Sequence, residues 1–194
     1  DHEEARHIAE ESMVLLKNAD DILPLKASEK VAFIGGFAKK PRFQGGGSSH
    51  INCFKVTNAF DSVPSDAQVI YAEGFPADRD LYDDTLAAEA LKTAGNADKV
   101  VIFAGLPDSF ESEGYDRSHM RLPECQNRLI AEILKVQPNA VIVLHNGSPV
   151  EMPWLSDVKG LLEAYLGGQA GGAAVADILY GKVNPSGKLA ETMP

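Results

Sequence analysis

Unbroken apolar runs recur along this chain, and they constrain its fold more than any other feature. The runs are rich in β-branched residues and lie at residues 30–36, 67–72, 99–106, 139–147 and 160–166. A strand with one exposed face alternates apolar and polar residues, whereas a strand covered on both faces is apolar throughout. We therefore expect a sheet of buried strands with other elements packed on both sides.

Helix-like patterns separate these runs, at residues 2–17, 83–96, 123–137 and 167–181. Strands that alternate with helices form βαβ units, which give a parallel sheet with helices on both faces. The chain has 194 residues and shows no linker or internal repeat, so we expect one domain over residues 1–194. The expected fold class is α/β, with a mostly parallel sheet of about five or six strands sandwiched between helices.

Charge argues against two classes of partner. The chain carries 18 basic and 28 acidic residues, a net charge of −10. Nucleic acids and anionic membranes both attract positive surfaces, so we expect neither as a partner. The N-terminal residues also lack the basic and apolar regions of a signal peptide. The expected compartment is the cytoplasm, unless a signal peptide lies in a preceding part of the protein.

The sequence has no metal or cofactor motif. The five histidines lack zinc-ligand spacing, and neither a GxGxxG nor a GxxxxGK[ST] phosphate-binding motif is present. Cys53 and Cys125 show no CxxC spacing, and we expect both to be buried free thiols. The expectation is a site without metal and a reaction without cofactor.

Two loops that follow predicted strands are unusually long, at residues 37–54 and 107–121. Loops of that length inside a compact domain are usually functional or disordered. In parallel sheets, ligands bind at the carboxyl ends of the strands, where such loops gather. We therefore expect both loops on the same edge of the sheet.

The second loop contains the segment "FESEGYDRSHMRL", residues 110–122. Repulsion among Glu111, Glu113 and Asp116 is expected to raise a carboxyl pKa, and Arg117 can pair with one of them. A carboxyl group that stays protonated near neutral pH suits a general acid. Tyr115 suits stacking on a sugar. A solvated charged loop explains the same composition, so the residues alone leave both readings open.

Longer motifs add a resemblance to a known family. The whole chain resembles the second, α/β-sandwich domain of family 3 glycoside hydrolases, above all the β-glucosidases. The motifs that carry it are "AEESMVLLKNADDILPL", "VAFIGG", "QGGGSSH", "SEGYDR", "VLHNGSPVEMPW" and "NPSGKLAETMP", in this order. The resemblance implies a retaining enzyme that hydrolyses terminal β-D-glucosyl residues of an oligosaccharide or glucoside, without a cofactor.

The resemblance also implies roles for individual residues. The acid/base glutamate of the family's (S/G)-E-G-Y segment falls on Glu113, with Glu111 as the rival. The aromatic residue that lines the sugar subsite falls on Tyr115, and the serine of the glycine-rich loop falls on Ser48. Asp116 and Arg117 are interpreted as loop-shaping residues.

This chain departs from the family's complete enzyme in one respect. In the family, a preceding TIM-like barrel supplies the aspartate nucleophile, and neither Asp66 nor Asp157 lies in a matching motif here. Residues 1–194 are therefore interpreted as a fragment of a larger enzyme, inactive alone. Two alternatives remain: a non-catalytic small-molecule-binding or interface module, and the same hydrolase domain with xylosidase or arabinosidase specificity.

Overall fold

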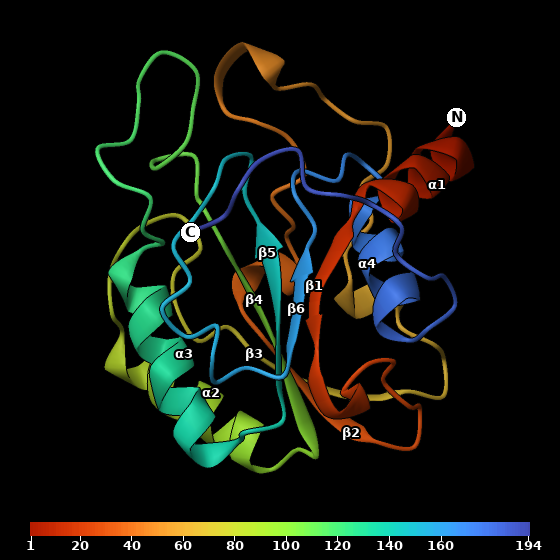
Figure 1. The fold of residues 1–194 in the computed structure, drawn as a ribbon, viewed down its shortest axis with the longest axis vertical. Helices are drawn as coiled ribbons and strands as arrows, with labels where there is room; N and C mark the ends of the chain where they lie inside the picture. The colour runs from red at the N-terminus through yellow and green to blue at the C-terminus, as the bar shows by residue number, and fades with distance from the viewer.

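The computed structural model describes residues 1–194, and one six-stranded sheet forms its centre (Figure 1). The strands are β1 (Val14–Asn18), β2 (Lys30–Ile34), β3 (Gln68–Ala72), β4 (Lys99–Gly105), β5 (Ala140–His145) and β6 (Gly160–Glu163). Their order in the sheet is β1-β6-β5-β4-β2-β3. β2 to β6 are parallel, and β1 pairs antiparallel with β6. The expected mostly parallel sheet is confirmed.

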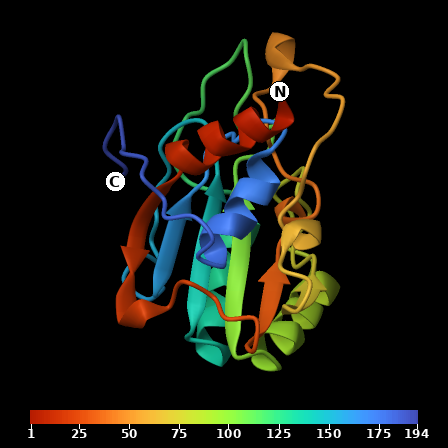
Figure 2. The same cartoon turned by 90° about the vertical axis from the view of Figure 1, so that its right-hand side faces the viewer.

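Four helices cover the two faces of the sheet. They are α1 (His2–Ser12), α2 (Asp84–Gly95), α3 (Glu124–Val136) and α4 (Gly171–Leu179). α2 and α3 lie on one face, and α1 and α4 on the other; Figure 2 shows the second pair in front of the strands. This confirms the expected sandwich. None of the helices has the length and apolarity needed to cross a membrane.

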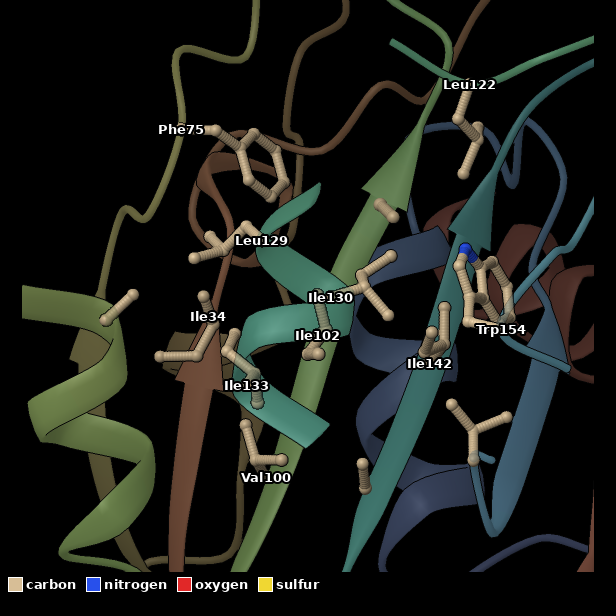
Figure 3. Packing of buried hydrophobic residues seen from close by; sticks show 14 of the residues in the cluster. Ile34, Phe75, Val100, Ile102, Leu122, Leu129, Ile130, Ile133, Ile142 and Trp154 are labelled. Atoms are coloured by element: carbon tan, nitrogen blue, oxygen red, sulfur yellow. The ribbon is translucent and has the colours of Figure 1, made fainter. Parts of the chain in front are cut away.

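The central strands are buried on both faces because their alternating side chains enter two separate cores. Ile102 of β4 and Ile142 of β5 point into the core under α2 and α3, while Phe103 of β4 points into the core under α1 and α4. In Figure 3, Ile130 and Ile133 of α3 lie beside Ile102 in the first of these cores. All five side chains are fully buried, and the burial of each one stabilises the fold by roughly 1.5–3 kcal/mol. Unbroken apolar runs were the sequence signal of this arrangement.

The N-terminal helix is shorter than expected. The pattern predicted a helix through Lys17, but α1 ends at Ser12 and Met13 is extended, with φ −72° and ψ 145°. The next residues form β1, whose backbone pairs with β6 from Val14 to Asn18. The aliphatic residues there suit either element, and pairing with the otherwise open edge of β6 favours the strand.

The strand order creates a switch point between β2 and β4. From β2 the chain crosses to β3 on one side, and it then returns past β2 to β4 on the other. Loops that follow strands on either side of such a point diverge and leave a crevice, the usual ligand site of open α/β sheets. The two long loops identified in the sequence are the ones that follow β2 and β4.

Both cysteines are free thiols, as expected, but their burial differs. Cys125 is buried at the start of α3, and burial raises the pKa of its thiol to about 12. Cys53 is partly exposed, which corrects the expectation that both would be buried.

Candidate active site

The loops after β2 and β4 rise side by side beyond the carboxyl ends of the strands (Figures 1 and 2). Glu113 in the second loop accepts two hydrogen bonds from Ser48 in the first. The backbone N–H of Ser48 lies 2.7 Å from Glu113 Oε2, and the Ser48 hydroxyl donates to the same oxygen. The expectation that both loops share one edge is confirmed.

The glycine run before Ser48 permits this close approach. Gly47 has φ +85°, a backbone conformation that favours glycine, and a Cβ there would lie 2.7 Å from the Cβ of Glu113. A Cβ on Gly46 would lie 2.6 Å from the hydroxyl oxygen of Ser112. Larger residues at these positions would therefore push the two loops apart. The glycines are therefore needed for close contact between the two loops, and not only for the backbone conformation of a turn.

Glu113 is an exposed carboxylate at the tip of its loop. The hydrogen bonds from the Ser48 hydroxyl and backbone N–H hold the pKa of Glu113 below its usual value. This corrects the expectation that repulsion within the acidic segment raises the pKa of a carboxyl group there. No hydrogen bond engages the second oxygen, Oε1. One oxygen is thus held in place while the other faces solvent.

Glu111, the rival of Glu113, is fully engaged by neighbouring groups. Arg42 Nη1 lies 2.5 Å from Glu111 Oε2, the backbone N–H of Gly147 donates to the same oxygen, and the Ser148 hydroxyl donates to Oε1. Burial raises the pKa of Glu111, but these hydrogen bonds outweigh it, so the pKa lies below its usual value. Glu111 therefore anchors the loop, and neither oxygen is free to transfer a proton.

Arg42 is a key residue that the sequence reading missed. Its buried guanidinium reaches from the loop after β2 to three groups of the loop after β4: the carboxylates of Asp108 and Glu111 and the backbone carbonyl of Glu111. Only its place in a long loop, among other basic residues, could have drawn attention to it. Arg117, expected to pair with a carboxylate, instead donates to the hydroxyl of Ser148 and the carbonyl of Pro149.

Tyr115 follows Glu113 by two residues in the loop and uses its hydroxyl internally. The hydroxyl donates to the backbone carbonyl of Asp108, and 49% of the residue is exposed. A bridge between Ser112 and Tyr115 closes the tip of the loop, where Gly114 has φ +93°. The ring is therefore available for an apolar contact, while the hydroxyl stabilises the loop.

The two aspartates considered as nucleophiles lie at the opposite ends of the strands from Glu113. Asp66 precedes the amino end of β3, and Asp157 precedes the amino end of β6, whereas Glu113 follows the carboxyl end of β4. Asp108, which does lie near the site, pairs with Arg42 and His50. The arrangement can therefore position one carboxyl group, that of Glu113, for proton transfer, while the carboxylates of Glu111 and Asp108 are held by other groups.

Comparison with known proteins assigns the family. The model of the Glycosyl hydrolase family 3 C-terminal domain matches residues 13–194. The chain belongs to this family. The resemblance stated from the sequence motifs is thereby confirmed, and the long loops are those of a glycosyl hydrolase family 3 C-terminal domain.

The relatives of this family 3 domain are larger glycosidases. Thermostable beta-glucosidase B of Acetivibrio thermocellus is 56% identical over 197 residues, which cover 100% of this chain and 26% of that protein. The Exo-alpha-(1->6)-L-arabinopyranosidase of Bifidobacterium longum is 45% identical over 205 residues, 27% of its length. The crystal structure of Bifidobacterium adolescentis GH3 beta-glucosidase superposes with a TM-score of 0.94 at 50% identity, covering 99% of this chain and 28% of that one.

The contact between Ser48 and Glu113 can be tested in this family 3 domain by titration. In Ser48→Ala the carboxylate loses the hydroxyl donor and keeps the backbone donor, so the pKa of Glu113 should rise part of the way to its ordinary value. Carboxyl ¹³C shifts of Glu113, followed by NMR across the acid range, measure this. Ser49→Ala is the matched control, because the Ser49 hydroxyl bonds Gly46 instead. Equal effects of both variants would contradict the assignment.

Removing Arg42 should destabilise the domain. Arg42→Met leaves Glu111 partly buried without its cation, and breaking a buried ion pair from one side costs about 3 kcal/mol or more. We expect a loss of about 3 kcal/mol in the free energy of unfolding, measured by urea denaturation. Arg79→Met removes an exposed pair with Asp78 and should cost less than about 1 kcal/mol. Similar losses in the two variants would show that the Arg42 pair is not a structural anchor.

Proposed function

We propose that this chain is the acid/base-bearing domain of a retaining β-glucosidase that hydrolyses terminal non-reducing β-D-glucosyl residues. Glu113 is the acid/base residue, Ser48 positions it, and the ring of Tyr115 lines the sugar subsite. The identity of 56% to a thermostable beta-glucosidase supports the reaction class. Because the chain spans 26% of that relative's length, the rest of the active site is assigned to another part of the parent enzyme.

The observation that carries this proposal is the contrast between Glu111 and Glu113. Both oxygens of Glu111 are bound by neighbours, whereas Glu113 is exposed and has one free oxygen. A general acid must reach the departing oxygen of the substrate, which Glu113 can do and Glu111 cannot. The contrast therefore supports Glu113 over Glu111.

The surroundings of Glu113 support a partner domain on this edge of the sheet. Phe54 is 99% exposed and Ile51 is 66% exposed, both in the loop that carries Ser48. Apolar groups with such exposure favour contact with another protein surface. The N-terminus lies at the same end of the molecule (Figures 1 and 2). We assign this end to a TIM-like barrel domain that supplies the nucleophile.

Contact with such a barrel would also prepare Glu113 for its role. In the chain alone, the pKa of Glu113 is lowered, so the group is a carboxylate near neutral pH. Covering it removes water, and a nucleophilic carboxylate about 5–5.5 Å away adds repulsion. Both effects raise a carboxyl pKa. The acid would thus acquire its proton only in the assembled site.

The chemistry then has two steps. Glu113 protonates the departing oxygen while the partner's carboxylate attacks the sugar, which gives a covalent glycosyl-enzyme. Glu113, now a carboxylate, takes a proton from water, and that water releases the sugar with net retention. Neither step requires a metal or a cofactor.

An arabinosidase or xylosidase specificity is the second candidate within the same chemistry. The relative from Bifidobacterium longum is an arabinopyranosidase and is 45% identical to this chain. Glucose and arabinopyranose share the ring that stacks on an aromatic side chain, and they differ in substituents that the barrel would contact. Rates of the parent enzyme with aryl β-glucoside and aryl α-L-arabinopyranoside decide between the two.

The non-catalytic alternative is tested by kinetics of Glu113→Ala and Glu111→Ala in the parent enzyme. Glucosides that differ in leaving-group ability separate loss of an acid from general damage. A binding or interface module would show no dependence on the leaving group in either variant.

A further inference from the structure

Glu163 is a buried carboxyl group to which the proposed reaction assigns no role. It ends β6 at the same edge of the sheet as the acid loop, and none of its surface is exposed. Its Oε1 accepts a hydrogen bond of 2.8 Å from the backbone N–H of Tyr165, and its Oε2 lies 3.2 Å from Asn146 Nδ2. Tyr165 itself has φ +50°, an uncommon conformation that this bond helps to hold.

A short chain of contacts links Glu163 to the anchor of the acid loop. Asn146 Nδ2 also donates to the carbonyl of Ser148, at 3.1 Å, and so shapes the turn after β5. That turn presents the N–H of Gly147 and the hydroxyl of Ser148 to Glu111. Glu111 lies two residues before Glu113. The position of Glu113 therefore depends on the turn at residues 146–148, which Glu163 holds through Asn146.

The burial of Glu163 favours its neutral form. None of its surface is exposed and no ion pair engages it, and a charged carboxylate in such surroundings is costly. The hydrogen bonds that its two oxygens accept from Tyr165 and Asn146 act in the opposite direction. Burial raises the pKa of Glu163 to about 8, against the opposing hydrogen bonds from Tyr165 and Asn146.

The charged groups around Glu163 act in the same direction. Glu111 from the acid loop and Glu191 from the C-terminal segment both raise its pKa. The cation of the network, Arg42, pairs with Glu111. His145 on the neighbouring strand is neutral near pH 7, because burial lowers its pKa to about 4.

Two further groups complete the surroundings. Arg117 contacts the hydroxyl of Ser148, and burial raises the pKa of the Tyr165 phenol. An ionised Glu163 would therefore be repelled by the carboxylates of Glu111 and Glu191. The nearby cations, Arg42 and Arg117, are bound to other groups.

We propose that Glu163 is a positioning residue for the acid loop: as a neutral carboxylic acid it fixes Asn146, and through the turn at residues 146–148 it holds Glu111 and the loop that bears Glu113. This inference rests on the proposed function for its catalytic meaning. The physical claim, that neutral Glu163 stabilises the acid loop, rests on its full burial and on the contacts that run through Asn146 to Glu111.

Hydrogen exchange of the acid loop tests the claim without an activity assay. Opening of the turn exposes Glu163 to water, where its pKa returns to about 4.5. A group whose pKa is raised in the closed state stabilises that state fully at pH values below its pKa in the open state. This stabilisation is lost as the pH rises from the open-state pKa to the closed-state pKa. Protection of residues 106–122, corrected for intrinsic rates, should fall by up to roughly tenfold per pH unit between about 4.5 and 8, then level off.

Glu163→Gln should keep the loop protected and remove this pH dependence, because the amide is neutral at every pH. The matched control is Glu10→Gln, which replaces another buried carboxyl with a raised pKa, at the contact between α1 and α4. It should keep the wild-type slope in residues 106–122. Asn146→Ala should lower protection of the loop at all pH values.

Three results would overturn the proposal. The first is a wild-type slope in Glu163→Gln. The second is equal loss of protection in the acid loop and in β5, which would indicate a general folding role. The third applies if Glu163→Gln does not fold, and it uses Glu191→Gln. Removing the exposed charge of Glu191 should lower the pKa of Glu163, so the pH at which protection levels off should fall. An unchanged pH profile of protection in Glu191→Gln would contradict the proposal.

Activity of the parent enzyme separates this proposal from the proposed function. Asn146→Ala should slow hydrolysis of a disaccharide more than that of a dinitrophenyl glucoside, because displacement of the acid matters only for poor leaving groups. If exchange behaves as expected but this selectivity is missing, positioning by Glu163 stands and the acid role of Glu113 fails.

Discussion

The isolated 194-residue chain is expected to hydrolyse an aryl β-glucoside no faster than buffer. Retaining hydrolysis uses two carboxyl groups about 5–5.5 Å apart. The nucleophile of that pair is assigned to the partner domain, and Asp108 near Glu113 is held by Arg42 and His50. The chain also lacks the sugar contacts assigned to the partner domain, so most of the transition-state stabilisation is missing. Enzymes of ordinary efficiency accelerate such reactions by at least about 10⁶-fold, and this whole factor should be absent.

The measurement is release of nitrophenol from p-nitrophenyl β-D-glucoside by the purified chain. The matched control is the Glu113→Ala chain, which detects contaminating glycosidase because a contaminant is indifferent to the substitution. Addition of the separately produced preceding part of the parent enzyme should restore turnover. Enzyme-like rates that vanish in the Glu113→Ala chain would mean that the chain holds its own nucleophile.

In the parent enzyme, Glu113→Ala is expected to slow hydrolysis of a disaccharide by roughly 10²–10⁴-fold, the usual contribution of a positioned general acid. A sugar alkoxide leaves poorly without a proton. Dinitrophenolate leaves without one, so the first step with a dinitrophenyl glucoside should be much less affected. The glycosyl-enzyme should then accumulate, because the attacking water has lost its base. A burst of dinitrophenolate followed by slow turnover is the expected trace.

Azide provides the confirming measurement, since this nucleophile needs no base. It should restore turnover of the dinitrophenyl glucoside by Glu113→Ala and release β-glucosyl azide. Glu111→Ala is the matched control from the same loop: it removes an anchor and should show neither strong leaving-group dependence nor azide rescue. If the two variants exchange these behaviours, Glu111 is the acid. If neither shows them, the acid lies outside this loop.

Relatives with different substrates share this domain, which agrees with a division of roles between domains. A beta-glucosidase at 56% identity and an arabinopyranosidase at 45% identity both align over the full chain. A general acid contacts the departing oxygen, which all glycosides have, whereas choice of sugar depends on contacts to the other hydroxyls. Specificity is therefore expected to follow the part of each protein that this domain does not cover.

Local patterns along the chain were sufficient to predict the layers of the fold. Burial on both faces requires unbroken apolar strands, and those strands were found within three residues of their bounds, apart from β1. The segment 14–18 was misread because aliphatic residues suit a helix or a strand, and pairing with β6 decided the outcome. That pairing joins distant residues, for example Val14 and Glu163, which are 149 positions apart, and no local window contains it.

The sequence by itself determined the fold class, the shared edge of the two long loops and, through motifs, the candidates Glu113, Tyr115 and Ser48. Only the tertiary structure decided how the carboxyl groups differ. Glu111 and Glu113 stand two residues apart in the same segment, yet one meets Arg42, 69 residues away, and the other meets Ser48, 65 residues away. The state of a carboxyl group depends on burial and on nearby charges and donors, and those neighbours come from distant parts of the chain.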